Sequence, residues 1–243
     1  MFSAYGCANP FMRRFSQKQI QRTISKYTTV ENEWDLSDTV RLKIAEVADS
    51  YELLDRMVEQ EGRMVRVDRF PYWAEIWPAS LGLARWLCQK TPAIGTGWTR
   101  ELGCGLGVVG LTLAALGWKV EATDYVEDAL IFATYNAQKN KLSDRHRVGY
   151  LDWSNPVGKA CDCLVASDVV YEKKNHVYLN RVLRALLQPG GRFYLSDPQR
   201  RSAKRFVEML VKQRYEHRVE TVTQRLGSID YRVNIHEFIK GPH

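Results

Sequence analysis

The feature that most constrains the fold is a glycine-rich turn that contains Gly103, Gly105 and Gly107. It follows a short apolar run and precedes a stretch, residues 108–116, whose composition favours a helix. Glycines at this spacing let the backbone turn sharply and approach a ligand closely, and the first N–H groups of the following helix point at that ligand. About 20 residues further on, Asp124 ends a second strand-like run, where its carboxylate can accept hydrogen bonds from ribose hydroxyls. Strand, glycine turn, helix, strand and acid together predict a nucleoside-binding unit.

An acid next to the glycine turn indicates which nucleoside it binds. A dinucleotide site reads G-x-G-x-x-G and holds a pyrophosphate at the helix N-terminus. In this chain the run is E-L-G-C-G-L-G, with Glu101 before the first glycine. A carboxylate there opposes a pyrophosphate and suits a cationic ligand such as S-adenosylmethionine, which carries an ammonium and a sulfonium. The run resembles the first motif of the seven-strand S-adenosylmethionine-dependent methyltransferases; a glycine-rich turn that binds no ligand is the alternative.

Strand-like and helix-like runs alternate from residue 98 to residue 213. Repeated β-α units predict a parallel sheet with helices on both faces. Two further strand-like runs, residues 218–224 and 231–239, flank a Gly-Ser turn and predict an antiparallel pair. We therefore expect an α/β fold with a Rossmann-like, mostly parallel seven-strand methyltransferase sheet, a C-terminal antiparallel hairpin and an N-terminal extension.

The chain divides into three segments by composition and periodicity. Residues 1–27 are predicted to be a basic, weakly ordered arm, and residues 28–70 an N-terminal hairpin or lid. Strand-like alternation at residues 42–47 and 63–67, with a helix-like stretch at residues 51–57, motivates the second assignment. Residues 71–243 are predicted to form the methyltransferase domain.

Charge and cysteine content bear on the partners and the compartment. The formal net charge is +7, with five Lys or Arg and no acid in residues 1–30, and eight Lys or Arg against three acids in residues 199–225. Each basic stretch is either a solvated face or a surface for an acidic partner.

The five cysteines are odd in number and form no C-x-x-C pair, which favours free thiols in the reducing cytoplasm. Residues 1–30 also have the composition of a transit peptide, which leaves a mitochondrial location as the alternative; no apolar run predicts a membrane segment.

Acidic residues end or follow successive predicted strands: Glu101, Asp124, Asp152 and Asp168. Ligands of open α/β sheets bind beyond the carboxyl ends of the strands, so these side chains are expected to surround one site. In the methyltransferases that the chain resembles, the position of Asp152 and Trp153 contacts the adenine. A core or interface role for Trp153 is the alternative.

Three short motifs make the resemblance more specific. Ser167-Asp-Val-Val-Tyr171 resembles the D-x-x-Y motif of the family-16 methyltransferases, which are mostly protein lysine methyltransferases, and Trp73-Ala-Glu-Ile-Trp-Pro-Ala-Ser80 resembles their aromatic-Trp-Pro signature. Ser196-Asp-Pro-Gln-Arg200 resembles the Asp-Pro-x-Arg element of the branch that contains the electron-transfer-flavoprotein β-subunit lysine methyltransferase and nicotinamide N-methyltransferase-like bacterial relatives. The resemblance covers approximately residues 70–240.

The resemblance implies a set of site residues. It gives Asp168 and Tyr171 catalytic roles and S-adenosylmethionine as the cofactor, with no metal. Tyr72, Trp73, Trp77 and Tyr171 are expected to form an aromatic channel for a cationic amine, although Trp73 and Trp77 could equally be core residues. The residues expected to bind the cofactor are Glu101, Gly103, Gly105, Gly107, Asp124, Tyr125, Asp152, Trp153, Ser167 and Trp77.

Three functions remain open from the sequence. The first is methyl transfer to a lysine side chain of a protein substrate, which could be acidic. The second is methyl transfer to a small amine or pyridine, and the third is a non-catalytic, cofactor-binding assembly protein. Nucleic acid is not expected as the substrate, because the Asn/Asp-Pro-Pro-Tyr/Phe run of the nucleobase N-methyltransferases does not follow the fourth strand.

Overall fold

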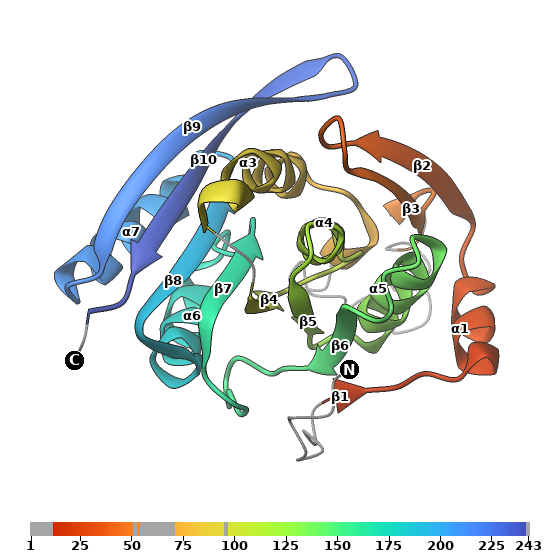
Figure 1. Cartoon of the computed structure of the whole chain (residues 1–243), viewed down its shortest axis with the longest axis horizontal. Helices are drawn as coiled ribbons and strands as arrows, with labels where there is room; N and C mark the ends of the chain where they lie inside the picture. The colour runs from red at the N-terminus through yellow and green to blue at the C-terminus, as the bar shows by residue number, and fades with distance from the viewer. Residues whose placement is uncertain (1–11, 51–52, 54–70, 95–96, 242–243) are drawn as a thin grey trace, which may run out of the picture.

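The computed structural model describes residues 12–50, 53, 71–94 and 97–241, and it is built around one eight-stranded sheet (Figure 1). The strand order is β1-β6-β5-β4-β7-β8-β10-β9. The strands are β1 (Met12–Arg13), β4 (Trp98–Leu102), β5 (Lys119–Asp124), β6 (His146–Tyr150), β7 (Cys161–Ser167), β8 (Leu187–Asp197), β9 (Glu216–Leu226) and β10 (Ile229–Ile239). Strands β6, β5, β4, β7 and β8 are parallel neighbours, whereas β10 runs antiparallel to β8 and β9. The predicted α/β fold with a mostly parallel sheet and an antiparallel C-terminal hairpin is confirmed, and β1 adds an eighth strand at one edge.

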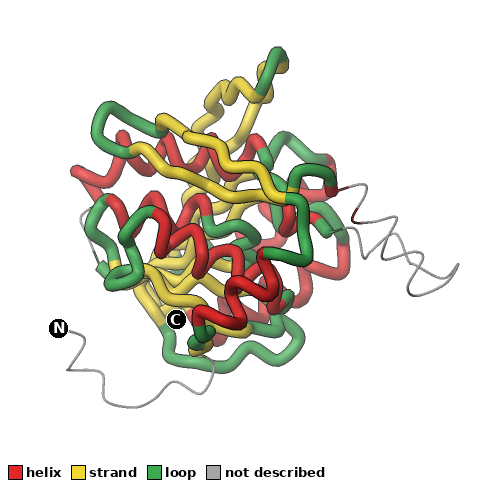
Figure 2. Tube along the Cα trace, turned by 90° about the vertical axis from the view of Figure 1, so that its right-hand side faces the viewer, coloured by secondary structure: helices red, strands yellow, loops and turns green. Residues whose placement is uncertain are grey.

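Helices cover both faces of this sheet. They are α3 (Pro78–Ile94), α4 (Val108–Ala115), α5 (Glu127–Lys139), α6 (Lys173–Leu186) and α7 (Arg201–Lys212). One buried cluster joins α3, α4 and α5 to the strands, and a second joins α6 and α7 to them, so the two groups lie on opposite faces. The tip of the β9–β10 hairpin projects at the top of both views (Figures 1 and 2). Within the described residues, no helix has both the length and the apolar character needed to cross a membrane.

The N-terminal extension contains a separate two-stranded sheet, β2 (Thr29–Asp35) and β3 (Arg41–Val47). The predicted strand at residues 42–47 is therefore present, and its partner is β2. That partner was missed because nearly all of its side chains are exposed, so it lacks the apolar alternation by which strands are identified. The predicted strand at residues 63–67, and the helix at residues 51–57 apart from Leu53, lie outside the described residues.

The described part of the N-terminal arm differs from the weakly ordered segment that its composition predicts. Residues 12–27 form β1, which pairs with β6, and α1 (Gln17–Ile24). Ser16 and Gln19 make a capping box at the start of α1, and Ile20 on its inner face is fully buried. Local capping and one apolar contact thus order a segment whose charge suggested disorder. Residues 1–11 lie outside the described part of the chain.

Candidate functional site

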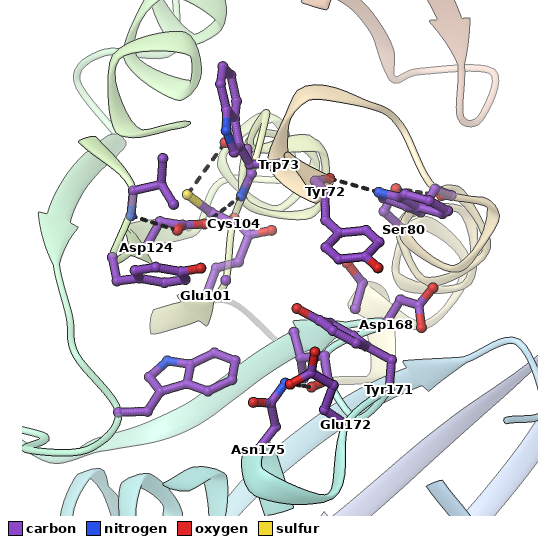
Figure 3. A pocket seen from close by; sticks show the side chains of 18 of the residues that line it. Tyr72, Trp73, Ser80, Glu101, Cys104, Asp124, Asp168, Tyr171, Glu172 and Asn175 are labelled. Carbon is purple, nitrogen blue, oxygen red and sulfur yellow. Dashed lines mark hydrogen bonds between the residues drawn. The ribbon is translucent and has the colours of Figure 1, made fainter. Parts of the chain in front are cut away.

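A cavity of about 740 Å³ opens at the carboxyl ends of the parallel strands (Figure 3). Its size is within the range of small-molecule sites. Of the twelve site residues expected from the sequence, eleven line it, and Gly107 instead occupies the N-cap position of α4. The lining residues that were expected are Trp77, Glu101, Gly103, Gly105, Asp124, Tyr125, Asp152, Trp153, Ser167, Asp168 and Tyr171. Figure 3 shows Glu101, Cys104 and Asp124 on one side of the cavity and Tyr72, Asp168 and Tyr171 on the other.

The glycine turn forms a tight cradle on the first side. Gly103 and Gly105 have φ angles of 66° and 50°, in the left-handed region that favours glycine. A Cβ at Gly103 would lie 3.2 Å from a methyl carbon of Val169, and a Cβ at Gly105 would lie 3.2 Å from the carbonyl oxygen of Trp73. Glycine is required here both by the backbone conformation and by the close neighbours, and it leaves the backbone exposed to a ligand.

Asp124 holds this turn in place. It ends β5 and is buried, with one carboxylate oxygen accepting the N–H of Gly105 at 3.1 Å and the other accepting the N–H of Val126 at 3.0 Å. Burial raises the pKa of Asp124, and these backbone donors oppose the rise. The backbone N–H of Tyr125 is a third donor, and a carboxylate has about four acceptor sites, so the residue can still accept a hydrogen bond from a ligand hydroxyl.

Glu101 is an acid of the site that burial strongly affects. It lies in β4, next to that strand's last residue, and its carboxylate accepts the N–H of Gly110 at 3.0 Å. Any Cβ at position 110 would collide with the carboxylate, so this helix glycine is what lets α4 approach it. Burial raises the pKa of Glu101 to about 8. A positive group next to Glu101 would offset that burial and favour the ionised form.

On the second side, Asp168 is already paired. Its carboxylate receives two hydrogen bonds from the guanidinium of Arg200, at 2.6 and 2.7 Å. The Asp168 backbone has a φ of 51°, which is uncommon for a residue with a side chain and is often found at functional sites. Burial raises the pKa of Asp168, and the hydrogen bonds from Arg200 oppose that rise. The sequence places Arg200 in a basic surface stretch; in the structure its side chain is partly exposed, and it also lines the cavity and binds Asp168.

Aromatic rings form the remaining wall. The ring centroids of Tyr72 and Tyr171 are 5.1 Å apart, and those of Tyr72 and Trp77 are 5.8 Å apart. Trp73 lines the same cavity, and its ring centroid also lies 5.7 Å from that of Tyr27 and 5.2 Å from that of Phe132. Trp73 is therefore both a cavity residue and a core residue. Trp153 likewise lines the cavity and packs against the core cluster.

Several lining residues were not predicted. The first turns of α6 contribute Glu172, its N-cap residue, together with Lys174, Asn175 and Tyr178. Their position in the sequence could have predicted them, because they directly follow the D-x-x-Y motif. The first turn of a helix after a parallel strand faces the ligand-binding edge of the sheet. Glu75 also lines the cavity, and its carboxylate accepts a hydrogen bond from Ser50; this contact between distant segments leaves no local pattern.

Comparison with known proteins places the chain among methyltransferases. The profile of the family described as lysine methyltransferase, Methyltransf_16, matches residues 72–213, more than half of the 243 residues. The chain belongs to this family. The resemblance drawn from the motifs is therefore confirmed, at the level of the family.

Two curated relatives match in part. The mouse protein named EEF1A lysine methyltransferase 3 is 29% identical over 157 residues, which cover 63% of this chain and 61% of that protein. A Schizosaccharomyces pombe protein of the UPF0665 family is 31% identical over 108 residues, or 41% of this chain and 33% of that protein. The matches thus span between a third and three fifths of the relatives' own length.

Solved structures share the fold at low identity. Magnesium protoporphyrin IX methyltransferase from Synechocystis, solved with bound S-adenosylmethionine, matches with a TM-score of 0.54 at 15% identity, over 80% of this chain and 99% of that chain. The [4+2]-cyclase SpnF matches with the same TM-score at 16% identity, over 66% and 80% of the two chains. Because the fold also occurs in a cyclase, the chemistry has to be argued from the site.

The residues of the first side fit S-adenosylmethionine. The glycine cradle admits close backbone contact, Asp124 has acceptor capacity for ribose hydroxyls, and the carboxylates of Glu101 and Asp124 suit a cationic ligand better than a phosphate. Glu101 supports this fit as well: no cation of the described residues is among the groups that perturb its buried carboxyl, so it is suited to receive a cation from a ligand. Among the described residues, no three His, Cys, Asp or Glu side chains group so that they could hold a metal ion.

Proposed function

We propose that this protein is an S-adenosylmethionine-dependent methyltransferase whose acceptor is a lysine side chain of another protein. One observation carries the proposal: a single cavity has a nucleoside-type cradle on one side and the paired Asp168 with aromatic rings on the other, in a chain of the lysine methyltransferase family. The name of the mouse relative supports a protein lysine as the acceptor.

One group of the site residues is proposed to bind the cofactor. The cofactor supplies a methyl group already activated on a sulfonium, so the chain needs only to bind, align and shield the reactants. Glu101, Gly103, Gly105 and Asp124 hold the cofactor side. Asp152, Trp153, Tyr125, Ser167 and Trp77 complete the cofactor-binding residues that we propose.

The acceptor must lose its proton before it can attack the methyl group. The rings of Tyr72 and Tyr171 lie side by side on the acceptor side, where they would shield a bound amine from water, and desolvation lowers the pKa of a lysine ammonium. Asp168 offers a carboxylate oxygen to an amine N–H, and Arg200 already balances its charge. The paired carboxylate therefore orients the amine without holding it in the protonated form as strongly as a free carboxylate would.

The proposal is tested with methyl-labelled cofactor and a cell extract. We expect label in protein, recovered after hydrolysis as methyllysine, and no label when the Asp124→Ala variant replaces the parent protein. Label confined to small molecules would support the amine or pyridine acceptor instead. Cofactor binding by calorimetry without transfer to any fraction would support the non-catalytic assembly protein.

A further inference from the structure

Helices α6 and α7 form one continuous surface beside the cavity. They lie next to each other on the same face of the sheet, at the left of the view in Figure 1, and share a buried cluster. Both begin at the cavity: Lys174, Asn175 and Tyr178 of α6 line it, and Arg200 directly precedes α7. A substrate protein whose side chain enters the cavity would therefore lie next to this surface.

The two helices carry nearly all of the uncompensated charge of the protein. Together they contain a single acid, Glu208, and eight exposed basic residues: Lys173, Lys174, Arg181, Arg184, Arg201, Lys204, Arg205 and Lys212. Their net charge is +7, the same as that of the whole chain, which has 35 basic and 28 acidic residues. The remaining 27 basic and 27 acidic residues balance each other.

Ion pairing differs between this surface and the rest of the described structure. Near the β2–β3 hairpin, Lys43 pairs with Glu33 at 3.1 Å and Lys139 pairs with Glu31 at 2.5 Å. On α6 and α7, Lys174 pairs with Glu172 at 2.8 Å. Among the described residues, no carboxylate lies within ion-pair distance of the other seven cations of the two helices. Adjacent unpaired cations repel each other, so an anionic partner would lower the free energy of the surface.

We propose that this surface, the α6–α7 face defined by the eight cations above, binds an acidic segment of the substrate protein next to the methylated lysine. The inference rests on the proposed function and specifies its substrate. Helix α6 has 14 residues and starts at the cavity; at 1.5 Å per residue it extends about 21 Å away from it. An extended segment of roughly six residues covers that length.

The surface suits a peptide better than a nucleic acid. Single-stranded nucleic acids bind where aromatic side chains stack on the bases beside a basic groove. The exposed aromatic residue of these two helices, Tyr178, belongs to the cavity wall, while the exposed apolar side chains among the cations are Val177 and Val211. Aliphatic contacts between charges accommodate peptide side chains and offer nothing for base stacking.

Charge reversal on α7 tests the proposal. The variant is K204E/R205E/K212E, and its matched control is R14E/K18E/R22E, which changes the net charge equally on exposed cations of the N-terminal arm at the other edge of the sheet. The probe is a fluorescein-labelled peptide of one lysine followed by eight glutamates, and binding is measured by anisotropy at 50 and 200 mM salt. We expect the parent and the control to bind alike, the α7 variant to bind at least tenfold more weakly, and the salt dependence of its binding to be reduced.

Two results would overturn the α6–α7 face as a docking site. One is equal peptide affinity of the parent, the control and the α7 variant at low salt; the other is tighter binding of a 16-nucleotide uridine RNA than of the peptide by the parent. The neutral variant K204Q/R205Q/K212Q, whose folding is checked by thermal unfolding, replaces the reversal if the reversal does not fold. Failure of the proposed function would give a different result. Neither the parent nor any variant would then produce methyllysine in the extract assay, and this outcome does not depend on the affinity for the peptide.

Discussion

At the scale of single residues, the two sides of the cavity differ in how their carboxylates are balanced. Within the described part of the chain, Glu101 accepts one backbone N–H and has no cation as a partner, and burial raises its pKa to about 8. Asp168 is bound by the guanidinium of Arg200 through two hydrogen bonds. A carboxylate without a partner attracts a cation, whereas a paired one attracts it less and still accepts hydrogen bonds. We therefore propose that the side with Glu101 receives the positive charge of the cofactor and that the side with Asp168 receives a neutral amine.

Removing Arg200 tests this difference. In Arg200→Ala the buried carboxylate of Asp168 loses the partner that opposes its raised pKa, so Asp168 takes up a proton at higher pH than in the parent. We expect methyl transfer to fall on the order of 100-fold near neutral pH and to recover partly as the pH rises, with cofactor affinity within a few fold of the parent. Rates from pH 6 to pH 9 and calorimetric cofactor binding measure both effects.

Three companion variants sharpen the result. Arg200→Lys keeps the charge but loses the paired geometry, so its rate should be intermediate, and Asp168→Ala and Tyr171→Phe should lose transfer while keeping the cofactor. A pH profile of Arg200→Ala parallel to that of the parent would remove Arg200 from any role through Asp168.

The protonation of Glu101 should also be visible in stability. In the unfolded chain its pKa is near the ordinary value of 4.5, whereas in the fold it is about 8. Between these values the folded state holds a proton that the unfolded state has lost, so this residue makes the free energy of unfolding fall as the pH rises from 4.5 to 8. Glu101→Gln keeps an acceptor for the N–H of Gly110 and removes the titration.

Urea unfolding without cofactor, at pH 5 and pH 8, measures this difference. We expect the variant to gain stability relative to the parent on going from pH 5 to pH 8. The neighbourhood contains His146, whose pKa burial lowers to about 4, but its titration is common to both proteins and cancels in the comparison. A constant difference between the two proteins would mean that Glu101 is ionised in the fold.

At the scale of elements, periodicity predicted the β-α units well and the N-terminal extension poorly. Strands β4 to β8 and their helices are apolar on the faces they bury. A buried face requires apolar residues at regular spacing, and this spacing can be recognised in the sequence. The extension is held by an apolar cluster that includes Leu42, Ile44 and Val47 of β3. It is also held by side-chain amides of α5, which lie about 90 residues away in the sequence. Asn136 of α5 accepts the N–H of Ala45 at 2.8 Å and donates to the carbonyl oxygens of Ala45 and Leu106 at 3.2 and 3.1 Å, and Asn140 bonds Lys43 in the same way. Two asparagines one helical turn apart thus bond the backbone groups of β3 that a neighbouring strand would otherwise bond. Because the partners are far apart in the sequence, no local pattern predicts these hydrogen bonds.

Asn136→Ala should therefore loosen the hairpin and the glycine turn together. The side chain is fully buried, so its removal leaves backbone groups of Ala45 and Leu106 without partners. A loss of about 3 kcal/mol in the free energy of unfolding follows from two or three such groups. Asn140→Ala, where the bonds to Lys43 are exposed, should lose less than about 1 kcal/mol. Urea unfolding of both variants measures the difference, and a loss for Asn136→Ala as small as the one expected for Asn140→Ala would show that the hairpin does not depend on Asn136.

At the scale of the whole molecule, the segments that composition separates are in contact. Tyr27, just after α1, lies against Trp73 of the cavity wall and Phe132 of α5, with centroid distances of 5.7 and 5.6 Å, and its hydroxyl donates to Asp128. Strand β1 extends the main sheet at the β6 edge. The division into an arm at residues 1–27, a hairpin or lid at residues 28–70 and a methyltransferase domain at residues 71–243 remains a proposal about folding units. Composition suggested it because charge is visible in a sequence, while these aromatic contacts depend on the tertiary structure.

Deleting residues 1–27 decides whether the arm is a separate unit. The deletion removes fully buried Ile20, the β1–β6 pairing and the contacts of Tyr27. Loss of the apolar burial of Ile20 and Tyr27 alone corresponds to about 3 to 5 kcal/mol, so the midpoint of urea unfolding should fall clearly. Cofactor affinity should fall as well, because Trp73 lines the cavity and loses a neighbour that fixes its ring. Deletion of residues 1–11 is the control, since it keeps β1, α1 and Tyr27. If both deletions unfold at the midpoint of the full chain, the arm contributes nothing to the fold and the separation suggested by composition is right.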